Sequence, residues 1–157
     1  SSSGTGHLQK GHGVAFGDWR RTGSLDIFVE TGGAVPGDQY HNVLFRNPGQ
    51  GNNWLNVKLV GTKSNRSAIG ARIKVTTAGD APATACRWVT SGSSFGANPL
   101  EQHVGLGKAG KIASLEVYWP TTGRTQTFRD LDVNQYLEIA EGTDRVRKRD
   151  LKPIPNS

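Results

Sequence analysis

Hydrophobic and polar residues alternate over short stretches along most of this chain. One stretch shows it most clearly: Leu55, Val57 and Leu59 are separated by the polar residues Asn56 and Lys58. Successive side chains of a β-strand point to opposite faces of a sheet. The pattern therefore predicts a strand with the three aliphatic side chains in a core and the two polar ones in solvent.

The same alternation returns at regular intervals, with Ile73 and Val75 facing inward and Arg72 and Lys74 outward. It predicts strands at residues 25–29, 42–46, 54–60, 71–75, 85–90, 102–106, 114–119, 125–129 and 135–139. Turn-forming Gly, Pro, Asn and Asp residues lie between them, and no segment carries a helical stripe of apolar residues. Short, evenly spaced strands predict an all-β fold, either a β-sandwich or a partly closed barrel of antiparallel strands.

The positions of these turn-forming residues also suggest how the chain is divided into segments. We expect residues 1–11 to be disordered or extended, 12–48 to form a repeat-like hairpin, 49–142 to form the main β domain and 143–157 to be an extended tail. A lone hairpin cannot bury its own faces or edges. We therefore expect the N-terminal hairpin to pack on the sandwich.

Composition narrows the class of protein. The chain of 157 residues has no methionine and begins with Ser1, which indicates a piece of a larger protein. We expect that protein to be secreted or on the cell surface. No apolar run approaches the roughly 20 residues that span a bilayer, so no membrane span is predicted. Cys86 is the single cysteine, so no internal disulfide can form.

The net charge of +6 raises the question of nucleic acid or another polyanion. Most basic residues are spread singly along predicted strands, where alternation directs them to solvent. Residues 145–149 are the one dense basic cluster, and they lie in the predicted tail. A solvated basic surface explains this distribution, and we do not expect a nucleic-acid function.

Two motifs have the outline of enzyme sites without their context. Residues 92–96 match G-x-S-x-G, with Ser94 in the place of a nucleophile and His103 as a formal partner. Residues 105–111 approach a phosphate-binding loop, with Ile112 where Ser or Thr is needed. Both motifs require a helix to begin at the loop, whereas here a strand follows. We therefore predict no catalytic residues and no enzyme.

A third motif has the outline of a calcium loop. Asp18 and Asp26 occupy the first and last acidic positions of D-x-D-x-D-G-x-x-D, but Arg20 and Thr22 occupy the middle two. Calcium needs several oxygen ligands with balancing negative charge. We expect Gly23 and an ion pair between Arg20 and Asp26 to keep the loop shape while calcium is lost. No metal or other cofactor is predicted, because the four histidines share no ligand spacing.

Longer stretches resemble known families. Residues 13–18 and 26–29 resemble one FG-GAP or VCBS repeat, the unit of integrin-type β-propellers. Residues 53–72, 91–95, 103–107, 117–120 and 136–142 resemble the ASPIC/UnbV domain of the cartilage acidic protein type. The resemblance implies a β-sandwich that follows a propeller in exported proteins, and it provides no catalytic residues. Trp88 lies outside the family pattern.

These observations predict a non-catalytic binding module whose partner is a polysaccharide or matrix glycan. An indole ring offers a flat face on which a sugar can stack. The candidate contact residues are Trp88, Trp19, Arg87 and Tyr40. Alternation leaves open whether Trp88 faces the core, because the opposite parity buries both Arg87 and Val89.

The other tryptophans and one asparagine are not expected to contact a ligand. Trp54 and Trp119 are expected in the core. Asn65 heads a glycosylation sequon, which indicates an exposed turn. The alternative function is a structural domain that caps the upstream propeller of the same parent chain and mediates protein–protein contact; a large apolar patch within residues 14–47 would favour it.

Overall fold

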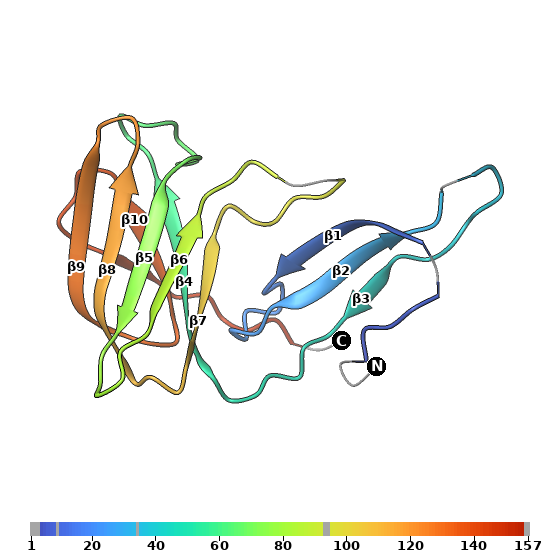
Figure 1. The fold of residues 1–157 in the computed structure, drawn as a ribbon, viewed down its shortest axis with the longest axis horizontal. Coiled ribbons are helices and arrows are strands. Elements are labelled where there is room, and N and C mark those ends of the chain that lie inside the picture. Colours follow the sequence, from blue (N-terminus) through green and yellow to red (C-terminus); the bar gives the residue numbers. More distant parts are fainter. Residues whose placement is uncertain (1–3, 9, 34, 93–94, 156–157) are drawn as a thin grey trace. The chain divides into compact units, whose positions relative to one another are not determined.

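The computed structural model describes residues 4–8, 10–33, 35–92 and 95–155, which form eleven β-strands and no helix (Figure 1). The chain divides into two compact units. The first contains residues 1–49, 92–99 and 154–157, and the second contains residues 50–91 and 100–153. The predicted all-β class is confirmed.

The second unit contains two four-stranded sheets. The first, here called the β4 sheet, has the order β11 (Arg147–Arg149), β10 (Gln135–Ala140), β4 (Asn53–Val60) and β7 (Gln102–Gly107). The second, the β5 sheet, has the order β6 (Thr84–Trp88), β5 (Arg72–Thr77), β8 (Lys111–Trp119) and β9 (Arg124–Asp132). The two sheets form a sandwich.

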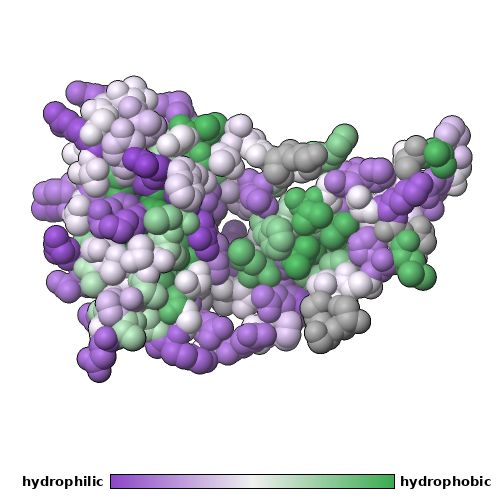
Figure 2. Space-filling model, in the orientation of Figure 1, coloured by the Kyte–Doolittle hydropathy of each residue, from purple (hydrophilic) through white to green (hydrophobic). Residues whose placement is uncertain are grey.

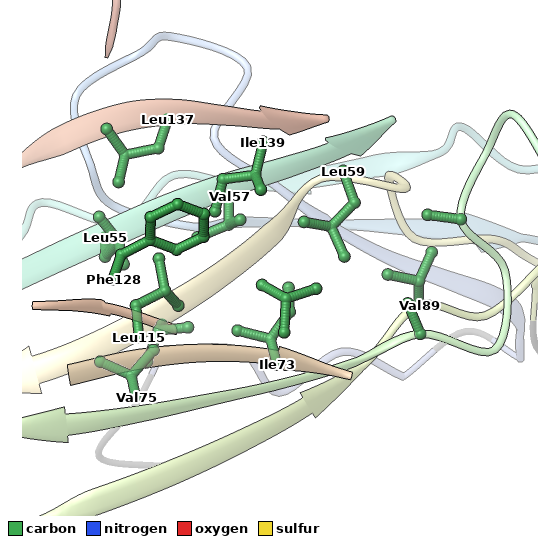
Figure 3. Packing of buried hydrophobic residues seen from close by; sticks show 14 of the residues in the cluster. Leu55, Val57, Leu59, Ile73, Val75, Val89, Leu115, Phe128, Leu137 and Ile139 are labelled. Atoms are coloured by element: carbon green, nitrogen blue, oxygen red, sulfur yellow. The ribbon is translucent and has the colours of Figure 1, made fainter. Parts of the chain in front are cut away.

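The core of the sandwich lies between the inner faces of these sheets (Figure 3). Leu55, Val57 and Leu59 point into it from β4, as their alternation predicted, and Ile73 and Val75 meet them from β5. Further members come from the remaining strands: Val104, Leu106, Ile112, Leu115, Val117, Trp119, Phe128, Leu137 and Ile139. The predicted core position of Trp119 is confirmed, since its exposure is 0%.

One strand pair departs from the expected antiparallel arrangement. Strands β4 and β10 are parallel, with Val57 opposite Leu137 and Leu59 opposite Ile139. Parallel neighbours need a long crossover connection, and here the chain visits the β5 sheet between them. Alternation shows which face of a strand is buried, but it does not show the strand's partner or direction. The sequence pattern therefore missed this pair.

The first unit is built on a three-stranded antiparallel sheet of β1 (Gly11–Gly17), β2 (Asp26–Thr31) and β3 (Val43–Phe45). Residues 95–99 pack against β1, where the backbone N–H of Phe16 donates to Oδ1 of Asn98 at 2.8 Å. The contact is close: a Cβ on Gly13 would lie 2.3 Å from the backbone oxygen of Phe95. Glycine at this position is thus a packing requirement.

A buried carboxylate, Glu141, joins three parts of the second unit just after β10 ends. Its Oε2 accepts hydrogen bonds from the backbone N–H groups of Thr62, Lys63 and Ser64 at 3.0, 2.8 and 2.7 Å. Its Oε1 accepts from the hydroxyls of Ser64, at 2.8 Å, and Thr122, at 3.1 Å. Glu141 therefore links the loop after β4, the end of β10 and the turn between β8 and β9.

These contacts favour the charged form of the carboxyl group. Burial alone raises the pKa of Glu141, but the hydrogen bonds from the backbone N–H groups of Ser64, Lys63 and Thr62 outweigh burial and lower it to about 2. The ordinary value is 4.5. The native state thus holds its Glu141 proton more weakly than the unfolded chain does, so Glu141 stabilises the fold above pH 4.5, and this contribution is lost as the pH falls toward about 2.

We predict that Glu141→Gln lowers the free energy of unfolding by about 2 kcal/mol at neutral pH, because charged hydrogen bonds become neutral ones and one acceptor oxygen becomes a donor. Urea unfolding measured between pH 7 and pH 2 should show that the free energy of unfolding falls more steeply with decreasing pH for the wild type than for the variant. The exposed acid Asp144 provides a control, and Asp144→Asn should follow the wild type. Parallel acid profiles for Glu141→Gln and the wild type would contradict the prediction.

Candidate ligand-binding surface

The outer face of the β5 sheet carries a row of side chains from four neighbouring strands. Arg72 on β5 lies opposite Trp88 on β6 and Tyr118 on β8, and Tyr118 lies opposite Thr125 on β9. Directly opposite residues share one face of a sheet. The order across the face is therefore tryptophan, arginine, tyrosine and threonine, with the two aromatic residues two strand spacings, or about 10 Å, apart.

Trp88 is exposed, with 55% of its surface accessible. The sequence left open which residues of β6 face outward. In the structure Cys86 and Trp88 point outward, while Val89 is buried and Arg87 is half-buried. Exposing so large an apolar side chain forgoes roughly 2 kcal/mol of burial energy. The exposed indole is therefore available to a partner.

Arg87 does not share this face. It lies opposite Ile73, whose side chain is in the core, and its Nε donates to the backbone oxygen of His103 at 3.0 Å. Its Nη1 donates to the backbone oxygen of Cys86 at 2.8 Å. Since His103 is on β7, Arg87 connects the β5 sheet to the β4 sheet. The geometry assigns it to the fold rather than to the surface around Trp88.

Arg72 and Tyr118 are in direct contact. The guanidinium carbon of Arg72 lies 4.4 Å from the centre of the Tyr118 ring, within cation–π range. With Trp88 they form what we call the aromatic platform, defined as Trp88, Arg72 and Tyr118. The platform lines a hollow of about 260 Å³, and the other lining residues are Ile73, Lys74, Cys86, Glu116 and Thr125.

The charges around the hollow do not cancel. Lys74 and Glu116 form an ion pair, with Nζ and Oε1 3.2 Å apart. Arg72 makes no salt bridge with a carboxylate among the described residues, so its positive charge is uncompensated there. The hollow therefore presents two aromatic groups around one free cation.

The other two predicted contact residues are in the first unit. Trp19 is 48% exposed and lines a hollow of about 520 Å³ with Phe28, Leu44 and Pro99. Tyr40 is 53% exposed and lies against His41, with ring centres 6.4 Å apart. Tyr40 is not among the residues that line the hollow at Trp19. Within each unit, therefore, the two predicted contact residues do not share a hollow.

The sequence missed Arg72 and Tyr118 and misplaced Trp54. Trp54 was expected in the core, but it is half-buried on the other face of β4 from Leu55. Its ring stacks on that of His103, with ring centres 6.1 Å apart, and lies tilted against the ring of Tyr136, with ring centres 4.8 Å apart. The outward parity of Arg72 was predicted. What could not be read from the sequence is that strand register sets it between two aromatic residues.

The predicted ion pair between Arg20 and Asp26 is present. Nη2 and Nε of Arg20 donate to Oδ1 and Oδ2 of Asp26 at 2.9 and 3.1 Å. Nη2 also donates to the backbone oxygen of Asn47 at 2.9 Å. Burial alone raises the pKa of Asp26, but the hydrogen bonds from Arg20 and from the backbone N–H of Asn47 keep it below the ordinary value. A guanidinium thus engages the carboxylate that a calcium loop would offer to the metal.

The rest of the loop keeps the shape that its glycine predicted. Oδ1 and Oδ2 of Asp18 accept the backbone N–H groups of Thr22 and Gly23 at 2.8 and 2.7 Å, and Gly23 has a positive φ of 80°. The described residues contain no cluster of three or more His, Cys, Asp or Glu side chains that could hold a metal ion.

The enzyme-like motifs have the following positions. Ser93 and Ser94 lie outside the described residues. Residues 105–111 span the connection from β7 to β8, as expected of a turn between strands. The sequon residue Asn65 lies in an exposed turn, where its side chain donates to the oxygen and accepts from the N–H of Ile69, at 2.8 and 2.9 Å.

The basic cluster at residues 145–149 is partly neutralised. Arg147 pairs with Glu138, with Nε and Oε1 3.1 Å apart, and Arg149 pairs with Glu101. The paired arginines lie on β11, which extends the β4 sheet.

Among the described residues, no helix is long and apolar enough to cross a membrane.

The fold defines the main unit as a two-sheet β-sandwich with an exposed aromatic and basic outer face. A family model described as ASPIC and UnbV matches residues 61–146, which is more than half of the chain. The protein therefore belongs to the ASPIC/UnbV family. The model does not cover residues 12–48, whose resemblance to an FG-GAP or VCBS repeat stays a prediction. No curated protein matches the chain.

The ion pair at Asp26 leads to a prediction about calcium. Because Arg20 engages Asp26, calorimetric titration with calcium chloride should show no binding at micromolar concentrations. Arg20→Ala should lower the melting temperature, since it leaves the buried Asp26 without its charged partner. Micromolar calcium binding by the wild type that disappears in Asp18→Ala would overturn this prediction.

Proposed function

We propose that this protein is a non-catalytic binding module of a larger secreted or cell-surface protein and that it binds a polysaccharide or matrix glycan. One observation carries the proposal: Trp88 is exposed on a rigid sheet, in a row with Arg72 and Tyr118. A sugar ring has one face of C–H groups that stacks on an indole or phenol ring. Its hydroxyls can meet polar groups beside those rings.

The surroundings of the platform suit such a ligand. The hollow of about 260 Å³ opens on the outer face, and Lys74, Glu116 and Thr125 border it with hydrogen-bonding groups. The strands beneath are anchored by the core side chains Ile73, Leu115 and Val117, all essentially inaccessible to solvent. A platform on anchored strands binds with little loss of conformational freedom.

An apolar surface in the first unit favours a second candidate function, a structural domain that mediates protein–protein contact. Phe28 lies opposite Ala15 on β1 and Leu44 on β3, and both Phe28 and Leu44 are more than 40% exposed. Hydrophobic side chains gather over these strands in Figure 2. Such a surface suits the face of another sheet, including that of an upstream propeller.

We predict that Trp88→Ala reduces retention on insoluble polysaccharides, or affinity in a glycan array, by at least about tenfold, the equivalent of 1.4 kcal/mol. The melting temperature should change little, because the indole is exposed. Tyr118→Ala should also weaken binding, since it removes the second ring.

Trp19→Ala is the matched control, because it removes another exposed tryptophan, which belongs to the first unit. It should leave glycan retention unchanged under the first function. Glycan binding that is lost in Trp19→Ala and kept in Trp88→Ala would contradict the assignment of the site. Protein capture without glycan binding, lost in Leu44→Asp, would favour the second function.

A further inference from the structure

The proposed glycan site has a feature that a neutral sugar would not use. Arg72 stands between two aromatic rings, and its guanidinium lies 4.4 Å from the Tyr118 ring centre. It makes no salt bridge with a carboxylate among the described residues. The neighbouring cation Lys74 is already paired with Glu116 at 3.2 Å. Within the described part of the chain, the hollow therefore carries one positive charge that no ion pair neutralises.

The shape of the guanidinium determines how Arg72 can serve a ligand. The guanidinium is planar and holds its N–H donors in that plane. Those donors form a planar fork that fits two oxygens of one carboxylate or sulfate group. A hydroxyl group can take only part of this fork.

We infer that the platform binds acidic glycans, with Arg72 holding an oxyanion substituent of a sugar, a carboxylate or a sulfate, while Trp88 and Tyr118 contact the sugar rings. This inference rests on the proposed function and narrows its ligand class. The protein's net charge of +6 adds a general attraction for polyanions. The test must therefore separate Arg72 from overall charge.

The sheet provides a matched control for charge. Arg129 is an exposed arginine on β9, paired with Ser114 on β8, which in turn lies opposite Thr76 on β5. Thr76 is four residues beyond Arg72, so Arg129 lies roughly 14 Å along the strands from the platform row. Arg72→Gln and Arg129→Gln remove the same charge from the same sheet, but only Arg72 lines the hollow.

The experiment measures affinity for polygalacturonate, dextran sulfate and neutral dextran at several salt concentrations. We expect tighter binding to at least one acidic polymer than to dextran, with affinity falling as salt rises. Arg72→Gln should weaken that binding at least tenfold, Arg72→Lys should restore part of it, and Arg129→Gln should change it less than twofold. Comparison of the two acidic polymers distinguishes a carboxylate from a sulfate ligand.

The outcomes separate this inference from the proposed function. The wild type would overturn the inference if it bound dextran as tightly as the acidic polymers and if this binding were lost in Trp88→Ala but unchanged in Arg72→Gln. The proposed function would still hold in that case. Equal losses in Arg72→Gln and Arg129→Gln would show general charge attraction and would also overturn it. Absence of Trp88-dependent binding to all three polymers would reject both. If Arg72→Gln fails to fold, Arg72→Lys still tests the inference, because lysine keeps the positive charge but lacks the planar fork and should bind the acidic polymer more weakly than the wild type does.

Discussion

The sandwich depends on one buried carboxylate, Glu141, at the place where the chain passes from one sheet to the other. The loop that leaves β4 must turn sharply before it enters β5: a Cβ on Gly61 would lie 2.1 Å from the backbone oxygen of Asn65. Such a turn leaves backbone N–H groups without partners in a strand or helix, and buried donors of that kind are costly. Glu141 accepts three of them at once.

The same carboxylate also helps to hold the β5 sheet, whose outer face carries the aromatic platform. Thr122, in the turn between β8 and β9, donates to Glu141, so this contact also holds one end of the β5 sheet. With core side chains beneath β5 and β8, the strands that carry Arg72 and Tyr118 are fixed on their inner side. The outer side can then keep an exposed tryptophan and a free cation without being needed for stability.

In the first unit, an ion pair and backbone hydrogen bonds organise the loop of residues 18–26. Asp18 organises its loop through backbone N–H groups, and Arg20 engages Asp26 with two hydrogen bonds. The side chain of Arg20 thus provides a positive charge next to the Asp26 carboxylate. Around this loop, the exposed Trp19, Phe28 and Leu44 form an apolar surface of a kind that stable sheets normally cover.

The sequence by itself determined the all-β class, the approximate strand positions and the inward parity of Leu55 and Ile73. These features follow from the period of two along a strand, which is local and is written in neighbouring residues. Alternation also predicted that Arg72 faces outward. The ion pair of Arg20 with Asp26 was readable because both residues belong to one short loop motif.

Tertiary structure decided the rest, because it depends on pairing between distant strands. The parallel register of β4 with β10 joins residues 80 positions apart, and the hydrogen bond between Glu141 and Thr62 joins residues 79 apart. The face on which Trp88 lies was ambiguous, because one parity exposes the apolar Val89 and the opposite parity buries the charged Arg87. Only the register of β6, β5 and β8 places Trp88, Arg72 and Tyr118 in one row, because side-chain alternation specifies a face and contains no information about which strand lies next to it.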